Sequence, residues 1–201
     1  HSEDGDLTLA VNGEIYNHRL LEGALRKPYA FQTGSDCEVI NALYLDGKGR
    51  DGGDVGSWLD RLNGIFAFAL WDRAAGRFII ARDHMGICPL YWGHDADGHL
   101  WVASELKAIA PFCADAALFP PGHVYDTGVG VLERYWLPTW RRVEAVEGVA
   151  PAPGALKAGL LEAVRCQLMG DVPYGVLLSG GLDSSLVAWG AHAARSGALA
   201  R

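Results

Sequence analysis

The sequence predicts two parts with different folds: an α+β first part built on antiparallel hairpins, then the beginning of an α/β part. Three observations lead to this prediction. Strand-forming runs come in pairs separated by turn signals between residues 64 and 136, as in β-hairpins. Prolines, glycines and mixed charges gather over residues 137–154, which is typical of a linker. Beyond the linker, helical, strand-like and helical patterns follow one another, the order found in parallel α/β sheets.

In the first part, we expect one opening strand, two short helices and three hairpins. The run LTLAV begins the strand at Leu7, and helical spacing follows at Asn17–Arg26 and Asp36–Leu45. Each hairpin places a turn signal between two strand-forming runs. The three hairpins occupy residues 64–83, 89–104 and 122–136.

In the second part, we expect a helix, a strand and another helix. Residues 155–169 have helical spacing with one apolar face. The members of that face are Leu156, Leu160, Leu161, Val164 and Leu168. YGVLL at residues 174–178 is a short continuous apolar run and predicts a strand, and residues 184–195 predict the second helix. One such unit is too little to fold alone.

Composition and charge narrow the class of protein. Half of the 201 residues are hydrophobic, so the chain can bury a sizeable core. The net charge of −7 argues against nucleic acid as a partner, because phosphate binding needs a basic surface. No apolar run is long enough to span a membrane, and the opening from His1 to Asp6 is not a secretory signal. We expect a cytoplasmic protein, and since no initiator methionine opens the chain, we interpret it as a fragment or a processed product.

The cysteines are expected to be free thiols in a reducing compartment, because they show no C-x-x-C spacing. They are Cys37, Cys88, Cys113 and Cys166. One of them could be a nucleophile, but small buried cysteines are common in cores. A zinc site is not expected, because His84, His94 and His99 lie in a glycine-rich region without helical i, i+4 pairing.

The stretch SGGLDSS, residues 179–185, combines glycines, serines and an aspartate between the predicted strand and helix. Gly180 and Gly181 can adopt positive φ, and the N–H groups of such a turn bind anions together with the helix dipole. Asp183 is a hard oxygen ligand that suits Mg²⁺. Hydroxyl donors come from Ser179, Ser184 and Ser185. The alternative, an ordinary turn in which Asp183 or Ser184 caps the helix, explains only one of these polar residues.

SGGLDSS resembles the pyrophosphate loop of the ATP-pyrophosphatase family. In that family, the loop holds the β- and γ-phosphates while ATP is cleaved between α and β, which gives an adenylated substrate. Several families share the loop, including tRNA-modifying enzymes and GMP synthetase. The net negative charge of this chain argues against tRNA as its substrate. Leu177 matches a family position that contacts the adenine nucleotide, although as a strand residue it is equally plain core.

The rest of the chain narrows the resemblance. Five further segments occur in order: LAVNGEIYNHRLLE, FQTGSDCEVI, LNGIFAFALWD, ARDHMGICPLYWG and VASELKAIAP. Together with DVPYGVLLSGGLDSS they resemble the glutamine-hydrolysing asparagine synthetases of the bacterial B type. The resemblance implies an incomplete class II glutamine amidotransferase (glutaminase) domain over residues 1–140, with an N-terminal-nucleophile-type αββα sandwich of two antiparallel sheets. Residues 154–201 would begin the α/β ATP-pyrophosphatase domain.

By this resemblance, the Asn12 side-chain amide and the Gly13 backbone N–H form the oxyanion hole that glutamine hydrolysis needs. The alternative for Asn12-Gly13 is a hairpin turn. It loses weight because the following residues continue as an irregular step and a helix, not as a second strand.

Glu14 and Asp36 resemble the family's glutamine-binding carboxylates, and Asp36 would pair with the substrate ammonium. The stretch SDCE is also a capping box, Ser35 with Glu38, and both roles can hold together.

Further along, Arg82 and Asp83 are interpreted as a structural ion pair, and Gly86 as a turn glycine. The family's nucleophile is a cysteine at the mature N-terminus, activated by its own α-amino group. That cysteine is absent from this chain, and none of the four cysteines present replaces it. We therefore expect this fragment to be inactive alone.

The resemblance implies ATP-dependent synthesis of asparagine. Glutamine releases ammonia in the first domain, and the second domain uses ATP and Mg²⁺, held by Asp183, to adenylate the aspartate side chain. Ammonia then gives asparagine, AMP and pyrophosphate. The implied partners are glutamine, aspartate and ATP, and a homodimer is allowed. Two alternatives stay open: a related synthetase that activates another carboxylate (β-lactam-forming or peptide-cyclising), and a non-catalytic amidotransferase-like module.

Overall fold

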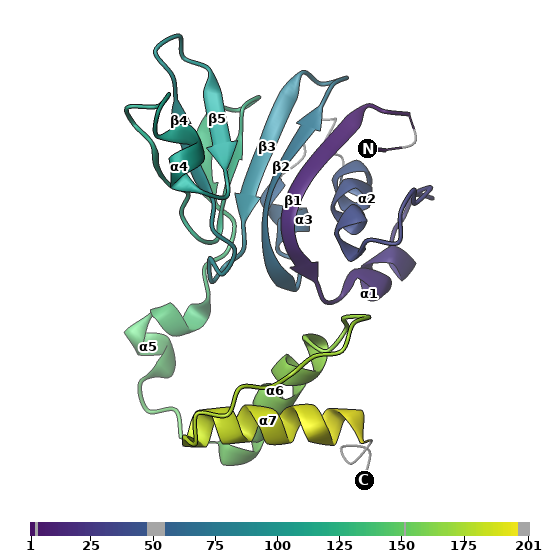
Figure 1. Cartoon of the computed structure of the whole chain (residues 1–201), viewed down its shortest axis with the longest axis vertical. Helices are drawn as coiled ribbons and strands as arrows, with labels where there is room; N and C mark the ends of the chain where they lie inside the picture. The colour runs from purple at the N-terminus through teal and green to yellow at the C-terminus, as the bar shows by residue number, and fades with distance from the viewer. Residues whose placement is uncertain (3, 48–54, 151, 197–201) are drawn as a thin grey trace. The chain divides into compact units, whose positions relative to one another are not determined.

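The structure of the chain, a computed structural model, describes residues 1–2, 4–47, 55–150 and 152–196 (Figure 1). The chain divides into two compact units, His1–Thr139 and Trp140–Arg201, which are described separately below. Among the described residues, no helix combines the length and the apolar character needed to cross a membrane.

The first unit is built around a five-stranded antiparallel sheet in the order β1-β2-β3-β7-β8. Its strands are β1 (Leu7–Ile15), β2 (Gly64–Asp72), β3 (Arg77–Arg82), β7 (His123–Asp126) and β8 (Val131–Arg134). Two of the predicted hairpins are confirmed as β2–β3 and β7–β8. Since β1 is at one end of the strand order, one of its backbone edges has no neighbouring strand among the residues that the structure describes.

The remaining predicted hairpin, at residues 89–104, belongs to a separate sheet. Strands β4 (Tyr91–His94) and β5 (Leu100–Ala103) pair antiparallel, and β6 (Ala117–Leu118) joins β4 on its other side. Helix α4 (Leu106–Ile109) lies beside β4 and β5, as Figure 1 shows.

Both predicted helices of the first unit are present. They are α1 (His18–Gly23) and the pair formed by η1 (Asp36–Glu38) and α2 (Val39–Asp46). A further short helix, α3 (Val55–Leu59), was not expected from the sequence. Helices α2 and α3 pack on one face of the five-stranded sheet, and several of the largest buried side chains lie there. These are Trp58, Tyr44, Phe66, Phe68 and Leu70.

The other face of the five-stranded sheet packs against the smaller sheet. Their shared core consists of Ala67, Ile80, Cys88, Leu90 and Phe119. Helix α4 then covers the far side of the small sheet, where the Cys113 side chain lies against Gly93. The layers are therefore helix, sheet, sheet and helix, and the predicted αββα sandwich is confirmed.

Buried charges tie the layers together by contacts that the sequence did not indicate. The Arg82 guanidinium donates to the backbone carbonyls of Gly86, Cys88 and Phe119, each at 2.7 Å. The fully buried Asp83 carboxylate accepts backbone N–H groups, including that of Phe66 at 3.2 Å. The predicted Arg82–Asp83 ion pair was wrong: in the described structure, each charge is satisfied by backbone groups. The turn role of Gly86 is confirmed by its φ of 68°.

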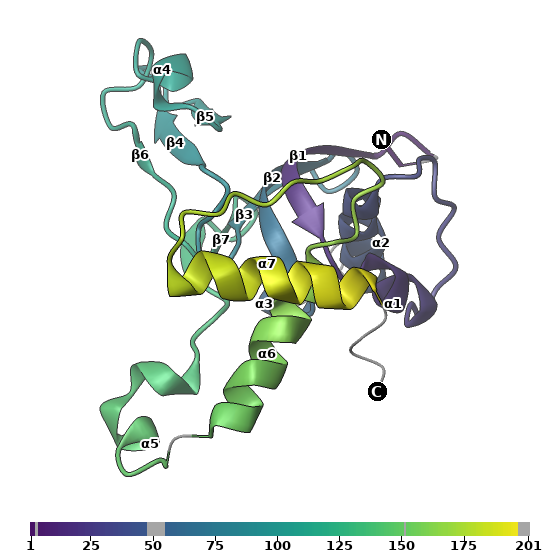
Figure 2. The same ribbon diagram turned by 60° about the horizontal axis from the view of Figure 1, so that its bottom comes forward.

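The second unit is helical. The linker region holds two short exposed helices, η3 (Thr139–Arg141) and α5 (Val143–Val146), which the sequence did not predict. Helices α6 (Pro153–Cys166) and α7 (Leu182–Arg195) confirm the two predicted helices and cross each other (Figure 2). They meet where Gly190 lies against Leu161 and Val164.

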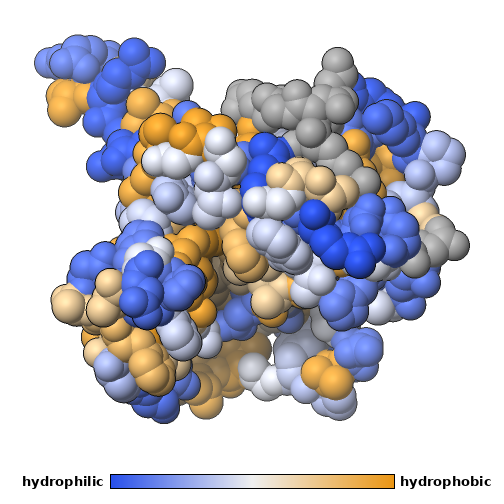
Figure 3. Space-filling model, turned by 90° about the horizontal axis from the view of Figure 1, so that it is seen from above, coloured by the Kyte–Doolittle hydropathy of each residue, from blue (hydrophilic) through white to orange (hydrophobic). Residues whose placement is uncertain are grey.

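The strand predicted at residues 174–178 was wrong, because this segment has no regular secondary structure. A strand needs a neighbouring backbone to hydrogen-bond with, and the described part of the second unit contains no other strand. The apolar side chains of the segment are exposed, and Leu177 is 95% exposed. Large apolar side chains lie at the surface of both units, and apolar atoms are visible among polar ones on the face in Figure 3.

Candidate functional site

The edge of β1 carries the first group of candidate residues. Two hydrogen bonds, Arg73 N–H to Asp6 O (2.9 Å) and Tyr16 N–H to Asn63 O (2.8 Å), fix the pairing of β1 with β2 at both ends. Hydrogen-bonded and non-hydrogen-bonded pairs alternate along an antiparallel ladder, so Gly13 and Ile15 belong to non-hydrogen-bonded pairs. Their N–H and C=O groups therefore face the outer edge of β1, away from β2.

Residues of η1 meet this edge. The Ile15 N–H donates to Asp36 Oδ2 at 2.5 Å, and Cys37 Sγ donates to the Gly13 carbonyl at 3.4 Å. The fold thus brings together Gly13 and Asp36, two residues that the sequence assigned to one site. The N–H of Gly13 lies on this same edge.

The backbone at Gly13 requires glycine. Its φ is 143°, and a Cβ atom there would lie 2.0 Å from the Ile65 carbonyl oxygen. The hairpin-turn alternative for Asn12-Gly13 was wrong, because both residues lie inside the nine-residue strand β1. The close approach of β2, rather than a turn, is therefore the reason for the glycine.

Asn12 and Glu14 alternate with Gly13 and are exposed on the face of β1 opposite to α2. The Asn12 side chain lines a pocket of about 200 Å³ between the two sheets. Other residues around this pocket are Ala10, Ala67, Leu90, Ala103 and Ser104. Within the described residues, the Glu14 carboxylate has no hydrogen bond or ion pair, so it is available to a ligand.

The predicted capping box is confirmed for Ser35 and wrong for Glu38. The Ser35 hydroxyl accepts from the Cys37 N–H at 3.3 Å and so caps η1, as expected. The Glu38 carboxylate does not accept a hydrogen bond from the Ser35 N–H, which donates to the Thr33 hydroxyl instead. Glu38 binds the preceding loop, accepting from the N–H groups of Gln32 and Thr33 at 2.7 Å each. It therefore holds the loop in front of Asp36.

None of the four cysteines has the environment of an activated nucleophile. All are free thiols, as expected. Burial raises the pKa of each thiol, and a nearby carboxylate adds to the rise. The pKa of Cys37 rises to about 12 because of burial and the neighbouring Asp36 charge. Since thiolate is the nucleophilic form, these environments favour inert thiols.

The second group of candidate residues lies in the loop before α7, in the second unit. Gly180 has the predicted positive φ, 84°, whereas Gly181 is extended, with φ −82° and ψ 167°. The hydroxyls of Ser184 and Ser185 donate to the Gly181 carbonyl at 3.1 and 2.8 Å, and the Ser179 hydroxyl lies 3.0 Å from that of Ser184. The three serines and two glycines therefore form one compact turn.

The helix-capping alternative for this loop was wrong. Gly181 is the N-cap of α7, and no side chain makes a capping hydrogen bond. Asp183 lies in the first turn of the helix, exposed, and without a hydrogen bond or ion pair among the described residues. Leu177 lies on the exposed segment before the loop, so the core alternative for it was also wrong.

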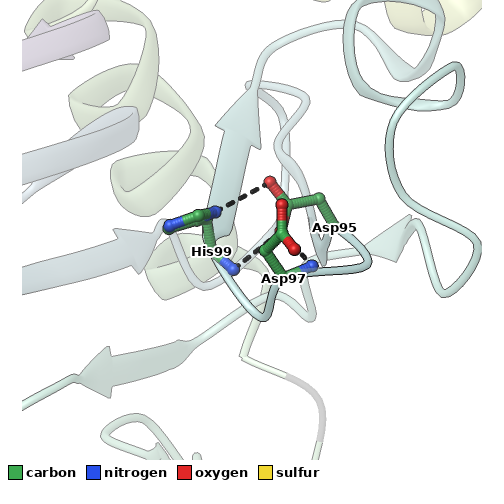
Figure 4. A group of neighbouring side chains, drawn as sticks. All are labelled: Asp95, Asp97 and His99. Carbon is green, nitrogen blue, oxygen red and sulfur yellow. Dashed lines mark hydrogen bonds and ion pairs between the residues drawn. The ribbon is translucent and has the colours of Figure 1, made fainter.

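A third group, Asp95, Asp97 and His99, gathers in the β4–β5 turn (Figure 4). Its possible ligand atoms lie within 4.8 Å of one another. The Asp95 carboxylate is already used by the turn, because it accepts from the N–H groups of Asp97 and His99 and from the Trp101 indole at 3.0 Å. The Trp101 bond, followed by the backbone bonds, lowers the pKa of Asp95 to about 2. A turn-forming role accounts for this group.

Sequence comparison links the two units to two families. Residues 1–111 match the model of the family described as "Glutamine amidotransferase domain". Residues 155–200 match the model of the family described as "Asparagine synthase". The two candidate groups, around Gly13 and around Asp183, fall within the first and the second match respectively.

Curated relatives are similar over most of the chain. Asparagine synthetase B [glutamine-hydrolyzing] of Escherichia coli K12 is 48% identical over 179 residues, 89% of this chain and 31% of the relative. Asparagine synthetase [glutamine-hydrolyzing] 2 of Arabidopsis thaliana is 47% identical over 188 residues, 94% of this chain and 31% of the relative. The chain thus spans about 31% of the length of these relatives.

Solved structures share the fold at low sequence identity. Glutamine phosphoribosylpyrophosphate amidotransferase from B. subtilis, complexed with ADP and GMP, aligns with a TM-score of 0.53 and 22% identity, covering 96% of this chain and 45% of that chain. A structure described as the allosteric regulatory enzyme of purine biosynthesis aligns with a TM-score of 0.53 and 23% identity, covering 92% and 43%. The fold is that of an N-terminal-nucleophile-type glutamine amidotransferase.

Proposed function

The chain belongs to the family of glutamine amidotransferase domains, and from this premise we propose that it serves a glutamine-hydrolysing asparagine synthetase. In the proposal, the first unit takes part in releasing ammonia from glutamine. The second unit begins the domain that activates aspartate with ATP. The observation that carries the proposal is the junction of Gly13 and Asp36 at the open edge of β1.

In the glutaminase step, the proposed role of Asn12 and Gly13 is to stabilise the tetrahedral oxyanion. Donors that are fixed before the reaction contribute most to such stabilisation, because they need no reorganisation. The Gly13 N–H meets this requirement: the β1–β2 register directs it to the open edge, and the Cys37 contact holds the adjoining peptide. The Asn12 amide lies on the exposed face of the same strand and lines the pocket between the sheets.

The proposed role of Asp36 and Glu14 is to bind the ammonium group of glutamine. Asp36 Oδ2 is already bonded to the Ile15 N–H, whereas Oδ1 makes no hydrogen bond within the described residues. The contacts of Oδ2 with the Ile15 N–H and the Cys37 thiol thus orient the carboxylate and leave the other oxygen available. Glu14 adds a second negative charge, and an ammonium between two carboxylates is favoured over a neutral amine.

In the synthetase step, the proposed role of the SGGLDSS loop is to bind the pyrophosphate of ATP. Backbone N–H groups at a helix N-terminus and serine hydroxyls suit phosphate oxygens, and the positive φ of Gly180 opens the turn. Mg²⁺ fits the exposed carboxylate of Asp183, a hard oxygen ligand that has no partner among the described residues. When bound, the ion would neutralise charge on the phosphates. Leu177 would contact the adenine nucleotide from the segment before the loop.

The complete proposal is that ATP adenylates aspartate on its side-chain carboxylate with release of pyrophosphate, and that ammonia then displaces AMP to give asparagine. Glutamine, aspartate and ATP are the proposed partners. The protein would be cytoplasmic and would bind neither nucleic acid nor membrane, and a homodimer is allowed. The proposed domains are residues 1–140 and 154–201, and the division of the structure after Thr139 supports that boundary. The net charge of −7 supports the absence of nucleic acid.

The product of the complete gene, with Asn12→Ala, tests this proposal. Glutamine-dependent ammonia release should fall about 10²- to 10³-fold, the usual cost of one oxyanion donor. Asparagine synthesis from added ammonia should persist, because the phosphate loop does not use Asn12. The control is Thr8→Ala, on the same exposed face of β1. Equal loss of both activities would make Asn12 a fold residue, and no activity in the wild type would leave the non-catalytic module as the better assignment.

A further inference from the structure

Cys37 occupies a place at the candidate site that sequence reasoning did not assign. Its Sγ atom lies 3.4 Å from the Gly13 carbonyl oxygen and 3.7 Å from Asp36 Oδ2. The side chain is 4% exposed. A buried donor therefore stands between the strand that carries the oxyanion residues and the carboxylate that would bind the substrate.

We propose that Cys37 is a positioning residue, whose thiol fixes the Gly13–Glu14 peptide and the Asp36 carboxylate relative to each other. The inference rests on the proposed glutaminase function and adds a residue to that site. Cys37 would not touch glutamine or the reacting atoms. Its effect would pass through the two groups that it contacts.

The contacts show why a donor is needed here. The Gly13 carbonyl faces the outer edge of β1, where no strand of the described residues pairs with it. A shielded carbonyl without a donor costs free energy, and the peptide would turn to find one. The Gly13 N–H belongs to the adjoining Asn12–Gly13 peptide, so a thiol that limits rotation of the Gly13–Glu14 peptide steadies the backbone beside it. The thiol prevents this rotation.

The same thiol stabilises the orientation of Asp36. Asp36 Oδ2 receives the Ile15 N–H at 2.5 Å and has the Cys37 sulfur as its other neighbour. A thiol has one proton to donate. The main hydrogen bond is the shorter one, to the Gly13 carbonyl, and the Asp36 carboxylate is the second acceptor. The pKa of Cys37, which burial and Asp36 raise to about 12, keeps that proton in place near neutral pH. Cys37 is thus a permanent donor and not a nucleophile.

The test uses Cys37→Ala and Cys37→Ser in the product of the complete gene. Alanine removes the donor, and serine keeps it while being smaller than cysteine. For Cys37→Ala, we expect kcat/KM for glutamine hydrolysis to fall about five- to tenfold, the usual effect of one hydrogen bond. Cys37→Ser should recover activity to within about twofold of wild type. Ammonia-dependent synthesis should be unchanged in both variants.

The matched control is Cys113→Ala, in which an equally buried thiol, 4% exposed, is removed from the α4 side of the same unit. It should leave glutamine hydrolysis unchanged. If Cys37→Ala behaves like this control, or if Cys37→Ser is as impaired as Cys37→Ala, Cys37 acts through packing alone and the inference is overturned. If the wild type hydrolyses no glutamine, the proposed function fails first, and the positioning role fails with it.

A second measurement does not depend on activity or on the folding of Cys37→Ala. The infrared S–H stretching band of Cys37 in the full chain is assigned as the band lost in Cys37→Ser. A hydrogen-bonded thiol should absorb at lower frequency than that of Cys113, whose sulfur makes no hydrogen bond among the described residues. A band at the same frequency as that of Cys113 would contradict the contact itself.

Discussion

The two candidate groups differ in how they are built. Around Gly13, the groups come from residues 13, 15, 36 and 37, and they meet only because η1 packs against the edge of β1. In the SGGLDSS loop, all of the groups come from residues 179–185, and their hydrogen bonds join residues at most five apart. One group is assembled by long-range packing and the other by local turn geometry.

This difference predicts how each group responds to change. A local turn keeps its shape when one side chain is altered, so substitutions in the loop should affect ligand binding and leave folding unchanged. A group assembled by packing couples to the sheet, so substitutions near Gly13 should affect both function and stability. The three predictions below test this contrast.

The largest effect is expected for Asp183→Asn in the product of the complete gene. Asparagine formation should fall about a thousandfold or more. A bound metal supplies several kcal/mol of transition-state charge stabilisation, and a neutral amide does not hold the metal as a carboxylate does. The loss should be the same with glutamine or ammonia, and glutamine hydrolysis should persist. Asp171→Asn, which alters a nearby exposed aspartate outside the loop, is the control. Normal synthesis by Asp183→Asn would remove the metal role.

A smaller effect, now on stability, is expected for Gly13→Ala. The new Cβ would meet the Ile65 carbonyl at 2.0 Å, and φ of 143° is unfavourable for alanine. Denaturant unfolding of the chain should show a loss of about 2 to 4 kcal/mol. Gly23→Ala is the control, since its Cβ would have nothing within 4 Å. A change below about 0.5 kcal/mol would mean that β2 does not approach Gly13 this closely.

The smallest effect concerns pH and Glu38. Burial alone would raise the pKa of Glu38, but hydrogen bonds from Gln32, Thr33 and Tyr29 outweigh burial and lower the pKa below 4.5. A carboxylate with a lowered pKa stabilises the fold above its unfolded pKa, and this stability is lost as pH falls through the folded pKa. Unfolding free energy should therefore drop by about 1 to 2 kcal/mol below pH ~4.5.

The Glu38→Gln variant should lose this part of the acid dependence and be less stable at pH 7 by the same amount. Glu133→Gln, on the exposed strand β8, should follow the wild-type profile. An unchanged acid profile in Glu38→Gln would show that the loop before Asp36 is held by other contacts.

The partners of the buried charges Arg82 and Asp83 could not be predicted from the sequence. An ion pair between Arg82 and Asp83 was predicted because the two opposite charges are adjacent in the sequence. In the fold, both side chains instead satisfy backbone groups, Arg82 as donor and Asp83 as acceptor. Which carbonyls and N–H groups lack partners depends on the path of the whole loop, which no local pattern contains.

The sequence by itself determined the local elements: the three hairpins, the helices with apolar faces, the N-cap at Ser35 and the positive φ of Gly180. Each depends on propensities and side chains within a few residues, and such short-range effects can be read from the order of residues. The tertiary structure alone decided that Asn12-Gly13 lies inside a strand, that Cys37 faces Gly13, and that residues 174–178 form no strand. These outcomes depend on which distant backbone supplies hydrogen-bond partners, and only the packing of the elements determines that.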